Sequence, residues 1–252
     1  MGKLDGKVAL LSGGSGGIAF EEARLFLQEG AKVILGDVRD DLGRKVEAEL
    51  AEAGGDVSYV HLDVTHEADW RSIVGLAESK YGKLDILVNN AGITIPKPLE
   101  ETTVDDWDRT MEVNVKGIFL GTKYAVEAMK KVGGGAIVNI ASTSGLGGNS
   151  HFLGSYGPSK AAVQNYSKII ALKYATDKIR CNTIFPGPID TPILWASIGD
   201  TPESRRQFID SVPLGRVGVP QDIAKGVLFL VSDDADWITG SDLVIDGGTR
   251  AN

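Results

Sequence analysis

Short apolar runs alternate with longer runs of helical periodicity along almost the whole chain. The apolar runs have the length of buried strands and predict strands at residues 8–11, 32–35, 57–62, 86–88, 136–140, 179–185 and 243–245. Between them, the spacing of apolar positions predicts helices at residues 17–29, 40–53, 66–81, within about 104–131, around 156–160 and at 220–230. This strict alternation indicates an α/β fold with a mostly parallel sheet covered by helices on both faces.

The connections between these elements are short, except between about residues 186 and 220. The 32 glycines cluster at the ends of apolar runs, which is typical of tight turns rather than of a linker. No internal repeat or low-complexity segment is evident. We therefore expect residues 1–252 to form one domain that combines binding and catalysis, with a substrate loop at about residues 188–215. In a doubly wound sheet, ligands bind at the carboxyl ends of the strands.

Composition excludes several classes of function. The net charge of −8 argues against a nucleic-acid surface, which would need a basic stripe. No apolar stretch approaches the roughly 18 residues of a membrane-spanning helix, and the N-terminus lacks the pattern of a signal peptide. A single cysteine, Cys181, permits no internal disulfide, and the three histidines show no metal-ligand spacing with it. These features predict a cytoplasmic protein with no nucleic-acid, membrane or metal partner.

A glycine-rich turn follows the first predicted strand and opens the first predicted helix, from Ser12 to Ala19. Gly13 permits a tight turn, and Gly17 lets the backbone approach a phosphate closely. The helix N-terminus then offers free N–H groups and a favourable dipole to a pyrophosphate. The alternative is a merely flexible turn. In this context the turn indicates a Rossmann-type dinucleotide site, with contacts expected from Ser12, Gly13, Ser15, Gly16, Gly17 and Ile18.

Asp37 and Val38 stand at the end of the second predicted strand, and Asp37 lies twenty residues beyond Gly17. A carboxylate there can accept hydrogen bonds from a ribose 2′-hydroxyl and would repel a 2′-phosphate, which favours NAD over NADP. Arg39, two residues on, is a candidate partner for a phosphate, but an exposed arginine is more often simply solvated.

Tyr156 and Lys160 are four residues apart, so they share one face of a helix. A phenol titrates near about pH 10 in water, and an ammonium beside it lowers that pKa. The pair therefore predicts a proton donor and acceptor that works near neutral pH. Alone, the same spacing arises by chance on solvated helix faces.

Taken together, the motifs resemble those of the classical short-chain dehydrogenase/reductase family over nearly the whole chain. The resemblance rests on the glycine turn, Leu62-Asp63-Val64, Asn89-Asn90-Ala91-Gly92, Val113-Asn114-Val115, Asn139-Ile140-Ala141-Ser142, Tyr156 with Lys160, Pro186-Gly187, and Ile245-Asp246-Gly247-Gly248. It implies hydride transfer between NAD and a secondary alcohol or ketone, in a homotetramer or homodimer.

The resemblance also implies residue roles. Tyr156 would be the catalytic acid or base, Ser142 would bind the substrate oxygen, and Asn114 would hold a water in a proton relay. Lys160 would lower the pKa of Tyr156 and also hold the nicotinamide ribose. The cofactor would be contacted further by Asp63, Val64, Asn90, Ala91 and Gly92 on the adenosine side and by Pro186, Gly187, Ile189 and Thr191 on the nicotinamide side.

The chain departs from the family pattern at three places. Ala19 stands where the family has a third glycine, which can weaken cofactor binding, and Ser12 replaces a threonine. Ser142 lies fourteen residues before Tyr156, one more than the usual spacing, so Thr143 and Ser144 remain alternatives for its role.

The substrate pocket is predicted to include Ser144, Phe152, Leu153, Ile193, Leu194 and Trp195. Their apolar character favours a cyclic or aromatic alcohol or ketone, although such side chains can equally cover core or a subunit interface. Two other functions remain open. One is a 3-oxoacyl-thioester (acyl-carrier-protein) reductase that uses NADPH, and the other is a non-catalytic NAD-binding scaffold.

Overall fold

The structure is a computed structural model that describes residues 2–147 and 154–251. Within these residues, seven parallel strands form one sheet in the order β3-β2-β1-β4-β5-β6-β7. The strands are β1 (Val8–Ser12), β2 (Lys32–Asp37), β3 (Val57–His61), β4 (Ile86–Asn89), β5 (Gly135–Ile140), β6 (Ile179–Pro186) and β7 (Asp242–Ile245). The predicted α/β, Rossmann-type doubly wound sheet is confirmed.

Strands β1 and β4 are neighbours in the sheet, with Ser12 paired to Asn89, and the order in which the chain adds strands changes direction between them. From β1 the chain runs outward to β2 and β3, and then returns to β4 and proceeds the other way. Such a switch point opens a crevice at the carboxyl ends of the central strands. The glycine-rich turn and the 89–92 segment both follow strands at this point.

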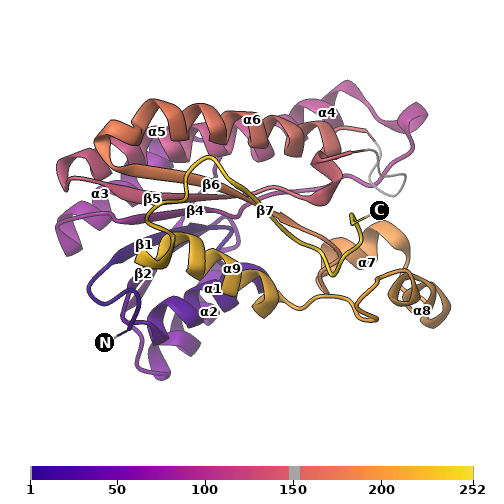
Figure 1. Cartoon of the computed structure of the whole chain (residues 1–252), viewed down its shortest axis with the longest axis horizontal. Coiled ribbons are helices and arrows are strands. Elements are labelled where there is room, and N and C mark those ends of the chain that lie inside the picture. The colour runs from indigo at the N-terminus through magenta and orange to yellow at the C-terminus, as the bar shows by residue number, and fades with distance from the viewer. Residues whose placement is uncertain (1, 148–153, 252) are drawn as a thin grey trace.

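Helices cover both faces of the sheet (Figure 1). They are α1 (Gly17–Gln28), α2 (Asp40–Glu52), α3 (Glu67–Tyr81), α4 (Val104–Met111), α5 (Gly117–Lys131), α6 (Tyr156–Tyr174), α7 (Pro192–Ile198), α8 (Pro202–Asp210) and α9 (Pro220–Val231). Helices α1, α2 and α9 lie on one face, and α3, α5 and α6 lie on the other (Figure 1). Side chains from each layer pack against the alternating faces of strands that are buried on both sides.

The helix predicted within residues 104–131 has an interruption. A π-helical segment, Glu112–Lys116, connects α4 directly to α5. Single π turns of this kind occur often at functional sites. Asn114, a predicted catalytic residue, lies inside the segment.

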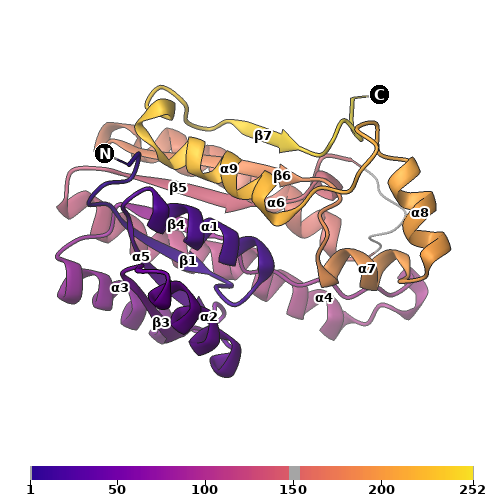
Figure 2. The same cartoon turned by 90° about the horizontal axis from the view of Figure 1, so that it is seen from below.

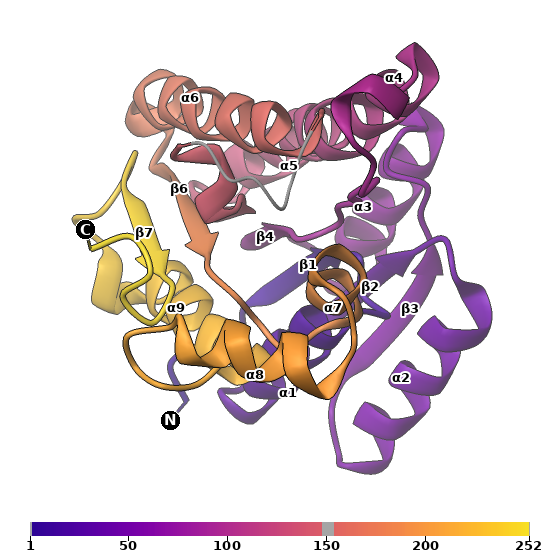
Figure 3. The same cartoon turned by 90° about the vertical axis from the view of Figure 1, so that its right-hand side faces the viewer.

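The long connection after β6 contains α7 and α8, each with proline in its first turn. Both helices lie beyond the carboxyl edge of the sheet (Figure 2). Viewed from that edge, α7 crosses in front of β1 and β2 (Figure 3). The expected substrate loop is therefore largely helical, and it lies over the end of the sheet where the glycine turn is found.

One carboxyl group lies in the core. Glu22 projects from the face of α1 that also buries Ala19, Ala23 and Phe26. Its side chain is 0 % exposed, and neither carboxyl oxygen has a hydrogen-bond partner among the described residues. Burial raises the pKa of Glu22 to about 8.

Two features are absent from the residues that the structure describes. No group of three or more His, Cys, Asp or Glu side chains lies together in a way that could hold a metal ion. Nor does that part of the chain contain a helix with the length and apolar character that crossing a membrane requires.

Candidate active site

The glycine-rich turn is tied to the segment after β4 by Ser12. Its hydroxyl oxygen accepts hydrogen bonds from the backbone N–H groups of Asn90 and Ala91, both at 3.2 Å. The Asn90 side chain donates in return to the Ser12 carbonyl at 3.3 Å. Gly13 has a φ of +70°, and a Cβ there would lie 2.9 Å from the Ala91 Cα. The tight turn predicted at Gly13 is thus required by both backbone conformation and the neighbouring chain.

The same turn leaves polar groups available for a ligand. The N-cap of α1 is Gly16, which supplies no side-chain hydrogen bond to the first turn of the helix. The Ser15 hydroxyl is buried and interacts with the Asp37 carboxylate. A Cβ on Gly17 would meet only Pro220 Cγ, at 3.7 Å. The N–H groups of a helix start and the open space beside Gly17 fit the phosphates of a dinucleotide.

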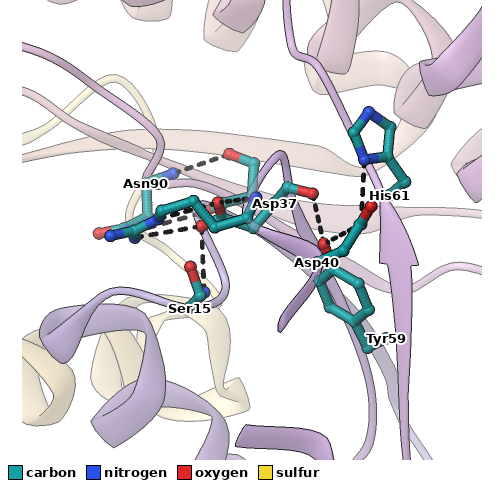
Figure 4. A network of polar contacts seen from close by, with 8 residues as sticks. Ser15, Asp37, Asp40, Tyr59, His61 and Asn90 are labelled. Atoms are coloured by element: carbon teal, nitrogen blue, oxygen red, sulfur yellow. Dashed lines mark hydrogen bonds and ion pairs between the residues drawn. The ribbon is translucent and has the colours of Figure 1, made fainter. Parts of the chain in front are cut away.

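Asp37 closes the other side of the turn at the end of β2 (Figure 4). Its carboxylate is 6 % exposed and accepts hydrogen bonds from the backbone N–H groups of Ser15, at 3.1 Å, and Arg39, at 3.0 Å. Burial alone would raise the pKa of Asp37, but the hydrogen bonds from Ser15 and Arg39 hold it below the usual value. Asp37 is therefore ionised at neutral pH.

A polar network that the sequence analysis did not predict fixes this strand end (Figure 4). The Tyr59 hydroxyl lies 2.6 Å from the Asp37 carbonyl oxygen and 2.8 Å from Asp40 Oδ1. His61 Nδ1 lies 3.0 Å from the same Asp40 oxygen. Neither Tyr59 nor His61 belongs to a motif, so only their position on the neighbouring strand β3 reveals the contact.

Asp63 and Val64 follow β3. Asp63 Oδ1 accepts hydrogen bonds from the Thr65 N–H at 2.9 Å and the Thr65 hydroxyl at 2.7 Å. Burial opposes ionisation of Asp63, but these bonds lower its pKa below the usual value. Val64 is buried, and a Cβ on Gly117 would lie 2.9 Å from it. Asp63 thus carries a negative charge near the adenosine end of the expected site.

Tyr156, Lys160 and Ser142 come together at the ends of β5 and α6. Tyr156 and Ser142 share a hydrogen bond, and Lys160 Nζ lies 5.7 Å from the centre of the Tyr156 ring. Lys160 is 3 % exposed, and its ammonium donates to the Ile140 carbonyl at 2.9 Å. These distances place an acid–base group, a hydroxyl and an ammonium within one small volume.

Burial has the largest effect on the pKa of both Tyr156 and Lys160. Burial raises the pKa of Tyr156, and the hydrogen bond with Ser142 opposes that rise only in part. Burial also lowers the pKa of Lys160 to about 8. The lowering of the Tyr156 pKa by Lys160 stays a prediction.

Three hydrogen bonds, two with Ile93 and one with Ser159, hold the Asn114 side chain. It is 0 % exposed, and its Oδ1 accepts from the Ile93 N–H at 2.8 Å while its Nδ2 donates to the Ile93 carbonyl at 2.9 Å. Nδ2 also donates to the Ser159 hydroxyl at 3.0 Å. A Cβ on Gly92 would lie 3.1 Å from Lys160 Nζ and 3.3 Å from Asn114 Oδ1. Asn114 Oδ1 and Lys160 Nζ therefore both lie close to Gly92, which leaves no room for a side chain there.

Ser159 is a site residue that the sequence analysis missed. Its hydroxyl donates to the Tyr156 carbonyl at 2.7 Å and accepts from Asn114, so it links the π segment to the first turn of α6. A serine beside Lys160 has no distinguishing pattern. Its role depends on a side chain forty-five residues away in the chain.

The residues expected on the nicotinamide side continue from the end of β6. Gly187 donates to the Ile245 carbonyl at 2.9 Å, and a Cβ there would lie 2.5 Å from Asp246. Ile189 is buried and pairs with Gly218 in an isolated bridge. Thr191 is the N-cap of α7. Pro186 and Thr191 thus lie at the two ends of the segment that runs from the sheet to α7.

The predicted pocket residues have different surroundings. Leu194 and Trp195 are buried, whereas Ile193 is 42 % exposed and faces solvent. Ser144 is buried beside Ser142, whose hydroxyl accepts from its N–H at 3.2 Å. The predictions for Phe152 and Leu153 fall outside the described residues.

Trp195 is held by polar neighbours rather than by an apolar wall. Its indole N–H donates to Asp190 Oδ1 at 2.6 Å, and the Arg205 guanidinium lies 4.1 Å from the ring centre. Arg205 in turn pairs with Asp200 at 2.5 Å. An open cavity of about 600 Å³ lies here, lined by Asp190, Thr191, Pro192, Trp195, Asp200 and Arg205.

Comparisons with known proteins agree with this arrangement. A family model described as enoyl-(acyl carrier protein) reductase matches residues 13–250. A cyclopentanol dehydrogenase of Comamonas sp. is 41% identical over 252 residues, which cover 100% of both chains. A 2,5-dichloro-2,5-cyclohexadiene-1,4-diol dehydrogenase of Sphingobium indicum is 42% identical over 249 residues, 98% of this chain and 97% of that protein. A solved structure of a short-chain dehydrogenase/reductase from Burkholderia xenovorans superposes with a TM-score of 0.91 at 33% identity, over 100% of this chain and 99% of the other.

Proposed function

Because this chain belongs to the short-chain dehydrogenase/reductase family, we propose that it is an oxidoreductase that interconverts a secondary alcohol and a ketone with a nicotinamide cofactor. The observation that carries the proposal is the meeting of Ser142, Tyr156 and Lys160 beside the crevice that the glycine turn borders. Neither a cofactor site nor an acid–base group alone would support it.

The bound cofactor would supply or accept the hydride. In oxidation, Tyr156 takes the proton of the substrate hydroxyl, and Ser142 donates a hydrogen bond to the same oxygen. Lys160, with a pKa of about 8, is mostly charged at pH 7 and stabilises the phenolate once Tyr156 has lost its proton. Asn114 holds the water through which that proton leaves the site. In reduction the same groups act in the opposite direction.

The proposed cofactor is NAD rather than NADP. Asp37 is ionised at neutral pH and stands at the end of β2, beside the glycine turn. A carboxylate at this place accepts hydrogen bonds from ribose hydroxyls and repels a 2′-phosphate. The groups that would hold the cofactor are those of the turn, Asp37 with Val38, Asp63 with Val64, residues 90–92, Lys160, and the segment from Pro186 to Thr191.

The proposed substrate is an apolar alcohol or ketone on a ring. Two relatives are named for cyclic alcohols, and helix α7, which contains Leu194 and Trp195, lies beyond the carboxyl edge of the sheet (Figure 2). We propose that this loop, which includes Ile193, forms the pocket together with Ser144. The description of the family model names an acyl-carrier substrate, and a reductase of such thioesters that uses NADPH is the second candidate. Asp37 argues against it.

The test is to mix the purified protein with NAD or NADP and cyclic, aromatic and short aliphatic secondary alcohols, and to follow the absorbance of the reduced nicotinamide. Turnover of a cyclic alcohol with NAD is expected. Tyr156→Phe should lose turnover and still bind NAD, and Tyr166→Phe on the same helix serves as the control. Full turnover by Tyr156→Phe would refute the catalytic assignment. NAD binding without turnover of any alcohol would favour the scaffold alternative.

We also propose that the chain assembles as a homotetramer or homodimer. Large apolar side chains are exposed, Leu172 at 84 % on α6 and Trp237 at 96 % in the segment that precedes the edge strand β7. Burying such groups against a second copy is favourable. Light scattering of the purified protein tests the assembly. A cytoplasmic location is consistent with the single cysteine and is part of the proposal.

A further inference from the structure

The hydrogen-bonding capacity of the Asp37 carboxylate is filled within the chain itself. Oδ1 accepts from the Arg39 N–H at 3.0 Å and from Arg39 Nε at 3.3 Å. Oδ2 accepts from the Ser15 N–H at 3.1 Å and from Arg39 Nη2 at 3.5 Å. A carboxylate has about four lone-pair positions, so these four donors leave none for a ribose hydroxyl.

The four bonds fall into two kinds. The two backbone bonds, from Ser15 and Arg39, are the shorter ones and come from the turn and the strand end. The two side-chain bonds are long for a charge-assisted pair, which typically measures about 2.7–2.9 Å. The Arg39 side chain is 54 % exposed, whereas Asp37 is 6 % exposed. The long side-chain bonds and the exposed guanidinium indicate a weak pair, so the Arg39 side chain can leave without breaking the two backbone bonds.

The guanidinium also lies beside the glycine turn. A Cβ on Gly16 would come within 4.0 Å of Arg39 Nη2. The exposed Arg39 guanidinium therefore lies close to both the Asp37 carboxylate and the glycine turn. A ligand that needs Asp37 as an acceptor has to displace Arg39, and a ligand that carries an anion at this place meets a cation already in position.

We propose that Arg39 competes with the cofactor ribose for Asp37 and thereby sets how strongly this protein prefers NAD over NADP. Binding of NAD requires the two side-chain bonds to Asp37 to break. Binding of NADP places a 2′-phosphate where the same guanidinium can pair with it, while Asp37 repels it. Arg39 thus lowers the affinity for NAD, raises the affinity for NADP and narrows the preference that Asp37 alone would impose. The inference rests on the proposed use of a nicotinamide cofactor.

The test measures binding without turnover. The dissociation constants of NAD and NADP are measured by calorimetry for the wild-type protein, Arg39→Met and Arg44→Met. Arg44 is a matched control because it lies on α2, the helix whose N-cap is Arg39, and its guanidinium faces the Tyr59 ring at 6.0 Å. Its loss removes the same charge without removing a bond to Asp37. Arg39→Lys is added because it keeps the charge but cannot pair in two places.

For Arg39→Met we expect NAD to bind up to about fivefold more tightly, the equivalent of one exposed ion pair. NADP should bind at least about tenfold more weakly, the equivalent of one hydrogen bond to a charged group. Arg44→Met should leave the ratio of the two constants unchanged, and Arg39→Lys should lie between Arg39→Met and the wild type. If Arg39→Met leaves the ratio of the NAD and NADP dissociation constants unchanged, or if Arg44→Met changes that ratio equally, the inference is overturned. Neither result would affect the proposed function. Weaker NAD binding by Arg39→Met would also overturn the inference. Failure of the wild-type protein to bind either nucleotide would overturn the proposed function as well.

Discussion

The buried carboxyl of Glu22 makes stability depend on pH in a direction that can be calculated. The side chain is 0 % exposed and lacks a hydrogen-bond partner among the described residues, so the folded protein holds it protonated. Its pKa rises from 4.5 to about 8 on burial. Between these two values the folded state binds a proton that the unfolded state releases. The stability contributed by the protonated group is therefore complete below about pH 4.5 and is lost progressively up to about pH 8.

The magnitude follows from the size of the shift. Each tenfold change in proton affinity corresponds to about 1.4 kcal/mol, so the full loss at high pH is roughly 5 kcal/mol. The loss is about 1 kcal/mol at pH 5.5 and about 4 kcal/mol at pH 8. Glu22→Gln removes the charge and keeps a polar group of the same shape. We expect the variant to gain roughly 3 kcal/mol of stability relative to the wild type when the pH is raised from 5.5 to 8.

Urea unfolding at both pH values, at one fixed protein concentration, measures this difference. Glu49→Gln is the matched control because Glu49 is an exposed glutamate on the neighbouring helix α2. The control should unfold in parallel with the wild type at both pH values. If Glu22→Gln also runs parallel to the wild type, Glu22 is ionised in the folded state and the argument from burial is refuted.

Three further substitutions test other contacts. Ser159→Ala removes one of the hydrogen bonds of Asn114, which is worth about 1 kcal/mol. The variant should have a kcat about fivefold lower, with little change in nucleotide affinity. An unchanged kcat would show that Ser159 does not contribute to the site. Gly13→Ala forces a side chain into a φ of +70° and to 2.9 Å from a neighbouring Cα, so it should lower Tm and weaken nucleotide binding by calorimetry; a wild-type Tm would contradict the turn geometry. Arg205→Ala removes a cation–π contact with Trp195 that is worth about 1 kcal/mol. The variant should have a higher KM for the alcohol and an unchanged affinity for NAD. An equal loss of affinity for the alcohol and for NAD would show that the contact lies outside the substrate pocket.

Much of the fold could be predicted because its signals are local. The apolar runs and the helical periodicity depend on residues that are neighbours in the chain, and they predict the strand and helix alternation that the structure confirms. The turn at Gly13 could be predicted in the same way, since only a small residue with a positive φ fits between a strand and the helix that follows. Helices α7 and α8 were not predicted, although Pro192 and Pro202 each occupy the first helical turn.

In the candidate site too, contacts between residues close in the chain could be predicted, and effects of distant residues could not. Tyr156 and Lys160 are one turn apart, so their proximity follows from the sequence once a helix is assumed. Their pKa values do not follow, because both depend on burial beneath segments that are distant in the chain. The π segment around Asn114 has no signature that the sequence analysis used, and its partner Ser159 lies on another helix.

The sequence by itself thus determined the α/β class, the position of the glycine turn and the candidate acid–base pair, since each depends on spacing within a few residues. Only the tertiary structure decided that Glu22 lies in the core with no hydrogen-bond partner among the described residues, that Arg39 contacts Asp37 and that Ser159 accepts a hydrogen bond from Asn114. The physical reason is that solvent exposure and hydrogen-bond partners are properties of the packed molecule. The sequence alone does not distinguish a carboxylate that contacts water from one that contacts an arginine or a hydrocarbon core.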